Sequence, residues 1–158
     1  MMSKRPDIGD NVPDIALETP EGGTVRALDF KGSKLVLFFY PKDDTPGCTV
    51  ENKDFSALAG EFEKAGVALL GVSKDPPKKH TKFIEKHGLS APLASDPPEN
   101  GLADALGIWV EKSMYGRTYM GMERTTYLVD ADGRIVQAWR KVKVKGHAEE
   151  VLAAAKAL

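Results

Sequence analysis

The fold of this chain is decided by residues 35–49, which read LVLFFYPKDDTPGCT. The first six of these residues are apolar or aromatic, as expected of a strand buried on both faces of a sheet. A turn-forming segment follows, and a helical pattern begins near Cys48. The sequence therefore places the only cysteine of the chain where a central strand passes into a helix.

A cysteine in that position is expected to be reactive. The first turn of a helix has unpaired backbone N–H groups and the positive end of the helix dipole, which favour a thiolate over a thiol. The alternative is that Cys48 is a buried cysteine acting as a small apolar residue. Because the flanking Thr45, Pro46 and Gly47 form turns rather than cores, we favour the reactive thiol.

The composition predicts one soluble globular domain over residues 1–158, with 42% hydrophobic and 28% charged residues. The net charge of -1 gives no reason to expect binding to nucleic acid or to a membrane surface. The polar start, residues 1–7, lacks the apolar core of a signal peptide, and no apolar run is long enough to span a bilayer. A single cysteine allows no internal disulfide, which predicts a reducing compartment such as the cytoplasm.

The order of the expected elements indicates an α/β fold. Residues 35–40 and 67–73 read as buried strands joined through a helix, a βαβ unit that should be parallel. Further strands are expected at 15–17, 24–28, 93–95, 125–129 and 135–139, and helices around 55–62 and at 78–87, 101–106 and 147–158. Residues 114–122 are expected to form a loop or a short helix, either as an apolar wall near Cys48 or as ordinary core. The pattern predicts a central mixed sheet with helices on both faces, as in the thioredoxin fold.

The spacing of Pro41, Thr45 and Cys48 is Pro-x3-Thr-x2-Cys, and the chain resembles the peroxiredoxins in this motif. The longer string FFYPKDDTPGCTVEN, residues 38–52, resembles their bacterioferritin comigratory protein branch, also called Q-type, as do residues 9–14 and 123–130. The resemblance covers nearly the whole chain. It implies a thioredoxin-like fold and reduction of hydrogen peroxide and organic hydroperoxides by Cys48, and we expect neither a cofactor nor a metal ion.

The resemblance also implies that Arg124 places a guanidinium beside the sulfur, where a fixed cation favours the thiolate and orients the peroxide. The alternative is an ordinary surface arginine. Glu51 either pairs with Arg124 or completes a helix-capping arrangement. Such a site needs hydrogen-bond donors that already point at the oxygen on which charge develops.

Three further residues complete the expected site. Thr45 lies one turn before the cysteine, so its hydroxyl can reach the sulfur or the peroxide, and it can also cap the helix. Gly47 offers a backbone N–H to the peroxide or merely sets the turn. Pro41 would shield the thiolate without adding an N–H group of its own.

Many members of this branch carry a second, resolving cysteine five residues after the first, where this chain has Lys53. The chain therefore resembles the one-cysteine variants, whose sulfenic acid is reduced by an external thiol, either thioredoxin or glutathione with glutaredoxin. We expect a monomer. A thiol–disulfide oxidoreductase is disfavoured because there is no Cys-x-x-Cys pair. A redox-signalling or holdase protein with little turnover remains open as the alternative.

Other polar residues are given no role in catalysis. His80 and His87 lie two turns apart on one expected helix, about 10 Å along its axis, which is too far to share a metal ion. His147 is expected in solvent. Lys141, Lys143 and Lys145 alternate with valines, which suggests either a lysine-guarded strand edge or an anion-binding stripe, and we favour the edge.

Overall fold

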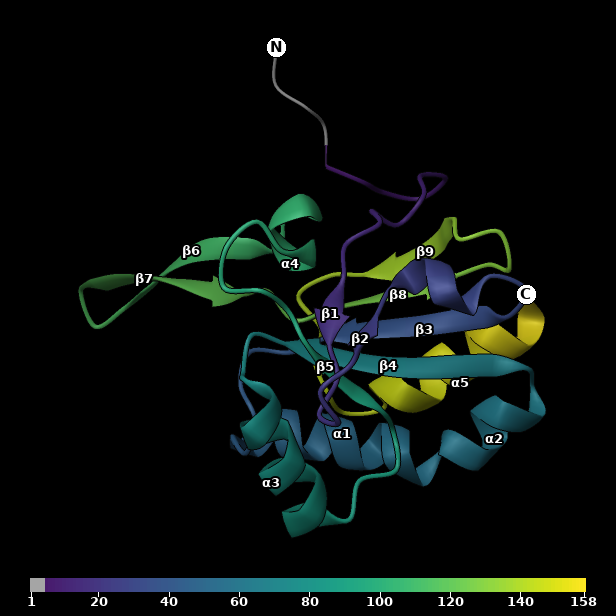
Figure 1. The fold of residues 1–158 in the computed structure, drawn as a ribbon, viewed down its shortest axis with the longest axis horizontal. Helices are drawn as coiled ribbons and strands as arrows, with labels where there is room; N and C mark the ends of the chain where they lie inside the picture. Colours follow the sequence, from purple (N-terminus) through teal and green to yellow (C-terminus); the bar gives the residue numbers. More distant parts are fainter. Residues whose placement is uncertain (1–4) are drawn as a thin grey trace.

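The computed structural model describes residues 5–158. The expected absence of a signal peptide rests partly on residues 1–4, which lie outside the described residues. A seven-stranded sheet runs through the described chain in the order β2-β1-β5-β4-β3-β8-β9 (Figure 1). In that order its strands are Thr24–Val25, Leu17–Glu18, Leu93–Ser95, Val67–Ser73, Lys34–Phe39, Thr125–Val129 and Ile135–Trp139.

The sheet is mixed, as predicted. Strands β3 and β4 are parallel, with Lys34 opposite Val67, and β4 is parallel to β5. On its other side β3 is antiparallel to β8, which is antiparallel to β9. Because consecutive side chains of a strand point to opposite faces, the apolar run of β3 supplies both faces of the sheet with core residues.

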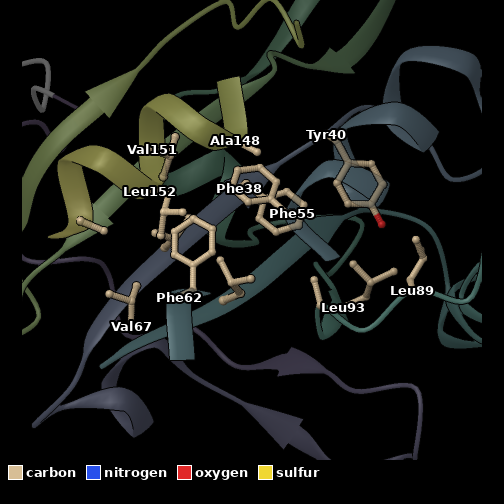
Figure 2. Close-up of a cluster of buried hydrophobic side chains, with 14 of the residues drawn as sticks. Phe38, Tyr40, Phe55, Phe62, Val67, Leu89, Leu93, Ala148, Val151 and Leu152 are labelled. Carbon is tan, nitrogen blue, oxygen red and sulfur yellow. The ribbon is translucent and has the colours of Figure 1, made fainter. Parts of the chain in front are cut away.

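The helices cover the two faces unequally. The longer ones are α1 (Pro46–Ala57), α2 (Ala59–Lys64), α3 (Pro77–His87) and α5 (His147–Ala157), and they pack on the face that carries Phe38 and Tyr40. In this core the rings of Phe38 and Phe55 stack with centroids 4.3 Å apart (Figure 2). The short α4 (Leu102–Ala105) and the 3-10 helix η1 (Ala27–Phe30) contribute to the core on the opposite face. Among the described residues, no helix is long and apolar enough to cross a bilayer.

The prediction of a loop or short helix at 114–122 is wrong. The strands β6 (Trp109–Met114) and β7 (Arg117–Met122) form a separate hairpin that projects from the main body (Figure 1). Its turn residues Tyr115 and Gly116 both have positive φ, as a type I′ hairpin turn requires. Tyr115 is 98% exposed, and Met114, Tyr119 and Met120 are also exposed, so of residues 114–122 only Met122 packs in the core.

Three smaller differences concern local elements. The strand expected at 24–28 ends at Val25, and its last two residues, Ala27 and Leu28, begin η1. The first helix breaks at Leu58, which separates α1 from α2. The segment from Lys141 to Lys145 belongs to no strand, so its alternating lysines do not guard a sheet edge.

Candidate active site

The β3–α1 connection places Cys48 in the first turn of a helix. Thr45 is the residue preceding α1 and is extended, Pro46 is the first helical residue, and the first turn contains no acidic residue. Proline suits that position because its missing N–H would be unpaired there in any case. The thiol group is therefore at the positive end of the helix, as predicted, and the residue is only 1% exposed.

The pairing of β3 with β8 brings Arg124 to the same place. Phe39 at the end of β3 lies opposite Thr125 at the start of β8, so the residue just before β8 faces the loop that leads to Cys48. Arg124 Nη2 donates to Cys48 Sγ over 3.4 Å. Burial alone would lower the pKa of Arg124, but the nearby charges of Glu51 and Cys48 raise it, so the guanidinium is a permanent cation beside the sulfur.

Glu51 holds the guanidinium from the other side. It lies one helical turn after Cys48, is 1% exposed, and its Oε1 accepts a hydrogen bond from Arg124 Nη1 at 2.6 Å. Of the two alternatives for Glu51, the structure has the pairing with Arg124. Burial raises the pKa of Glu51 to about 7, against the opposing effect of Arg124. Its other oxygen, Oε2, has no hydrogen-bond partner among residues 5–158.

The three remaining predicted residues lie on the loop or at the helix start, with different contacts. The Thr45 hydroxyl donates to the Lys42 carbonyl at 2.7 Å and makes no capping bond to the helix. A side chain at Gly47 would place its Cβ 3.2 Å from Arg124 Nη2, so glycine lets the guanidinium come close to the helix. Pro41 is half-buried and directly follows Tyr40 at the end of β3.

Two residues near Arg124 were not predicted to lie at the site. Lys112 on β6 donates to the Met122 carbonyl at 2.6 Å, and burial together with the charge of Arg124 lowers its pKa. His147 is buried rather than solvated, which corrects the prediction, and its Nε2 lies 2.8 Å from Thr126 Oγ1. Burial and Arg124 lower the pKa of His147 to about 4, so it is neutral at pH 7. Lys112 was missed because its hairpin was missed.

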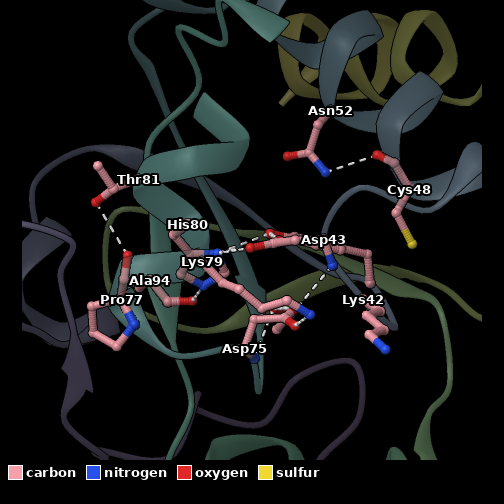
Figure 3. A network of polar contacts seen from close by, with 12 residues as sticks. Lys42, Asp43, Cys48, Asn52, Asp75, Pro77, Lys79, His80, Thr81 and Ala94 are labelled. Atoms are coloured by element: carbon pink, nitrogen blue, oxygen red, sulfur yellow. Dashed lines mark hydrogen bonds and ion pairs between the residues drawn. The ribbon is translucent and has the colours of Figure 1, made fainter. Parts of the chain in front are cut away.

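A second polar network lies behind the loop that precedes Cys48. His80 is fully buried, and its Nδ1 and Nε2 lie 2.7 Å from Asp43 Oδ2 and 3.0 Å from the Ala94 carbonyl (Figure 3). Both ring nitrogens therefore have an oxygen partner within hydrogen-bond distance. The Tyr40 hydroxyl donates to Asp43 Oδ1 at 2.6 Å. The network fixes the loop to α3 without touching the sulfur.

The two histidines of α3 contact different aspartates. His87 Nε2 lies 2.9 Å from Asp44 Oδ1, while His80 pairs with the preceding aspartate. Within residues 5–158, no group of three His, Cys, Asp or Glu side chains is arranged to hold a metal ion.

Comparison with known proteins identifies the family. The AhpC/TSA family model matches residues 8–138. The chain is 47% identical over 146 residues to peroxiredoxin Bcp of Bacillus subtilis, covering 92% of each chain. It is 53% identical over 137 residues to peroxiredoxin Bcp of Xanthomonas campestris, covering 86% of this chain and 85% of that one. The chain belongs to the AhpC/TSA family and, within it, to the Bcp/Q-type peroxiredoxins, which are thiol peroxidases.

Solved structures agree with this assignment. A structure of the Xanthomonas campestris bacterioferritin comigratory protein, described in connection with alkyl peroxide reduction, matches with a TM-score of 0.88 at 47% identity. The match covers 96% of this chain and 98% of that one. The Xylella fastidiosa PrxQ structure matches with a TM-score of 0.90 at 40% identity and covers 98% of each chain. The predicted thioredoxin-like fold and the predicted branch are both confirmed.

Proposed function

We propose that this peroxiredoxin reduces hydrogen peroxide and organic hydroperoxides at Cys48 and is returned to the thiol by an external thiol. The observation that carries the proposal is the contact of 3.4 Å between Arg124 Nη2 and Cys48 Sγ. A guanidinium held there by Glu51 favours the thiolate and presents a fixed donor to the incoming peroxide. The similarity to a protein described in connection with alkyl peroxide reduction supports organic hydroperoxides as substrates.

In the first step, the Cys48 thiolate attacks the terminal oxygen of the hydroperoxide. A sulfur–oxygen bond forms and the O–O bond breaks, so the sulfur is oxidised to a sulfenic acid and the peroxide is reduced. The leaving oxygen takes a proton and departs as water or an alcohol. Arg124, with the backbone N–H groups of Gly47 and Cys48, stabilises the charge that develops on the oxygens.

The remaining site residues shape this step. Glu51 fixes the guanidinium through its bond of 2.6 Å. The Thr45 hydroxyl, which donates to the Lys42 carbonyl at 2.7 Å, can still accept a hydrogen bond from the bound hydroperoxide. Pro41 limits access of water to the thiolate.

The chain holds no second cysteine, and Lys53 at the usual resolving position is exposed. An external thiol therefore completes turnover, with thioredoxin or glutathione and glutaredoxin as the candidate reductants. We also propose that residues 1–158 act as one domain and as a monomer in the cytoplasm. The seven-stranded sheet, which includes strands from both ends of the described chain, supports a single domain, and the single cysteine suits a reducing compartment.

The test compares wild type with Cys48→Ser. Wild type with an added thiol should consume both hydrogen peroxide and tert-butyl hydroperoxide, and Cys48→Ser should consume neither while keeping its circular dichroism spectrum. Mass spectrometry after one equivalent of peroxide should find a sulfenic acid at Cys48, an adduct with the outside thiol, or a Cys48–Cys48 dimer. Peroxide consumption by Cys48→Ser above buffer, or rapid multiple turnover of wild type without any thiol, would contradict the proposal.

A further inference from the structure

The hairpin β6–β7 gathers exposed apolar side chains on a part of the chain that projects from the main body (Figure 1). Its exposed large apolar residues are Met114, Tyr115, Tyr119 and Met120. The other exposed residues of this kind in the described chain are far apart in the sequence, at Ile8, Leu28, Val50 and Leu158. A cluster of exposed apolar residues marks an interaction surface, and methionine adapts its shape to varied partners.

The root of this hairpin is anchored, whereas its outer part is a sheet of two strands only. At the root, Trp109 lies opposite Met122, which is 1% exposed and packs in the core. Lys74 Nζ lies 4.9 Å from the centroid of the Trp109 ring and fixes the root from another side. A two-stranded hairpin is marginally stable in water unless a further strand or a packed face supports it. The outer part of the hairpin therefore favours the addition of a strand.

Strand β7 offers an open edge for such an addition. Because Met114 and Arg117 flank a two-residue turn, they exchange backbone hydrogen bonds, and the N–H and C=O groups of Thr118 and Met120 point outward. No backbone hydrogen bond within residues 5–158 reaches these outward groups. Charged side chains protect a sheet edge, and β6 carries a glutamate and a lysine, whereas β7 carries one arginine. Of the two edges, that of β7 is the less protected.

One face of the hairpin combines apolar groups with two cations. The register places Lys112 beside Tyr119 and Met114 beside Arg117, and alternation along the strands puts all four on the same face. A Cβ at Gly121 would lie 3.0 Å from Lys112 Cδ, which agrees with this placement. Neither cation forms an ion pair within residues 5–158. Acidic side chains at alternate positions of an added strand would supply the missing partners.

We infer that β7 binds an extended segment of another protein, which adds antiparallel to its outer edge and alternates acidic with apolar side chains. The backbone groups of Thr118 and Met120 hold the segment, and Arg117 selects acidic residues on the cationic face. The apolar residues of the segment lie on the other face, against Met120. The inference concerns binding alone and does not rest on the proposed peroxidase activity.

Two other occupants fit these observations less well. A membrane surface cannot hydrogen-bond an open strand edge, because hydrocarbon has no donors or acceptors. A second copy of the chain, paired by a two-fold axis, would bring Lys112 and Arg117 of both chains to one face, where like charges repel. An acidic segment neutralises the same two cations.

This surface continues to the edge of the active site. Lys112 and Val110, which share the cationic face, also line a hollow of about 530 Å³ together with Arg124. Arg124 Nη2 in turn contacts Cys48 Sγ. A segment bound along β7 therefore lies beside the reactive cysteine without replacing any of its contacts.

The test is an NMR titration of the wild-type protein with a short acetylated and amidated peptide in which valine alternates with glutamate. The peptide should shift the amide signals of Thr118, Tyr119 and Met120. It should also slow hydrogen exchange of the Thr118 and Met120 amides, because these outward groups become hydrogen-bonded. A peptide with lysine in place of glutamate should bind about tenfold more weakly, because two cations then face like charges.

Two proline variants separate the edges of the hairpin. Thr118→Pro removes an outward N–H from β7 and should weaken binding of the glutamate peptide about tenfold. Ser113→Pro is the matched control, because Ser113 lies opposite Thr118 and its N–H points outward from β6 instead. It should keep the wild-type affinity. Arg117→Glu should reverse the preference, so that the lysine peptide binds more tightly than the glutamate peptide.

Four results would overturn the inference. These are the absence of amide shifts with the glutamate peptide, equal weakening in both proline variants, equal binding of the two peptides to wild type, and an unchanged preference in Arg117→Glu. Sedimentation equilibrium provides a further check. A dimer that Thr118→Pro dissociates would assign the edge to a second copy and would also overturn the inference.

Discussion

Two buried pairs of polar side chains lie close to the reactive cysteine, and they differ in how completely their hydrogen-bonding groups are satisfied. The pair Asp43–His80 joins side chains that are 2% and 0% exposed, and tyrosine and backbone partners use the remaining positions. The pair Glu51–Arg124 leaves one carboxylate oxygen without a partner in the described chain and gives its second guanidinium nitrogen to the sulfur.

This difference indicates that Asp43–His80 supports the fold, whereas Glu51–Arg124 takes part in the reaction. A fully satisfied buried network holds its residues in one arrangement, because any change leaves a group unpaired at high cost. A pair with unused capacity can interact with a substrate instead. We therefore expect changes at Asp43–His80 to affect stability first, and changes at Glu51–Arg124 to affect the rate of the peroxide reaction first.

The largest expected effect is on stability. His80→Phe leaves Asp43 Oδ2 and the Ala94 carbonyl without their hydrogen-bond partner, and each unsatisfied buried group costs about 1–3 kcal/mol of unfolding free energy. Urea denaturation measures the loss. The double variant His80→Gln with Asp43→Asn replaces the pair by two amides that can hydrogen-bond to each other, and it should recover part of the lost stability. A denaturation midpoint that stays at the wild-type value in His80→Phe would show that Asp43–His80 does not stabilise the fold.

Arg124→Ala should act mainly on the rate. Loss of a donor that stabilises developing charge typically costs about 10²–10³-fold, so the oxidation of Cys48 by peroxide should slow by about that factor. Stability should fall less than in His80→Phe, because the raised pKa of Glu51, about 7, lets this carboxyl take up a proton when its partner is gone. Stopped-flow rates and urea denaturation on the same preparation would show which of the two quantities changes more.

The pKa of Glu51 predicts a pH-dependent stability. Between its ordinary value of 4.5 and about 7, the folded state binds more protons at this site than the unfolded state. The contribution of Glu51 to stability is therefore full below pH 4.5 and falls as the pH rises toward 7. Glu51→Gln should remove this decline, which amounts to about 3 kcal/mol.

The neighbouring His147 works in the opposite direction. Its pKa is lowered from 6.5 to about 4, so its contribution to stability is full above pH 6.5 and is lost as the pH falls toward 4. Denaturation of wild type and Glu51→Gln between pH 4.5 and 7 should give a difference in unfolding free energy that grows as the pH rises. A constant difference would mean that Glu51 titrates normally.

The smallest expected effect is at Gly47. An added methyl group would lie 3.2 Å from Arg124 Nη2, tighter than ordinary contact, so Gly47→Ala should push the guanidinium slightly away from the sulfur. We expect peroxide oxidation to slow a few-fold, with a change in unfolding free energy below about 1 kcal/mol. The double variant Gly47→Ala with Arg124→Ala should be no slower than Arg124→Ala alone, and an additive effect would show that Gly47 acts through another group.

The sequence predicted the parts of the molecule that depend on strong local patterns. The apolar run of β3, the proline and glycine around Cys48 and the turn at residues 130–133 determine the central sheet and the cysteine position. The family resemblance also implied Arg124 beside the sulfur, and it left the pairing of Arg124 with Glu51 as one of two alternatives. The hairpin β6–β7 escaped detection because most of its residues are exposed and show no periodicity, and Lys112 escaped with it.

His80 and His147 illustrate a different limit. Both lie on helices that were predicted, but their burial depends on partners distant in the chain, Asp43 and Thr126. A spacing argument can exclude a shared metal ion, as it did for His80 and His87. It cannot identify the carboxylate or hydroxyl that tertiary packing brings to each ring.

The central claim is that the position of Cys48 beside Arg124 makes its sulfur unusually reactive toward peroxide. The most direct test is the second-order rate constant for oxidation of wild-type Cys48 by hydrogen peroxide, measured by stopped flow near neutral pH. We predict a value several orders of magnitude above that of free cysteine under the same conditions, and a fall of about 10²–10³-fold in Arg124→Ala. A wild-type rate constant equal to that of free cysteine would contradict the account.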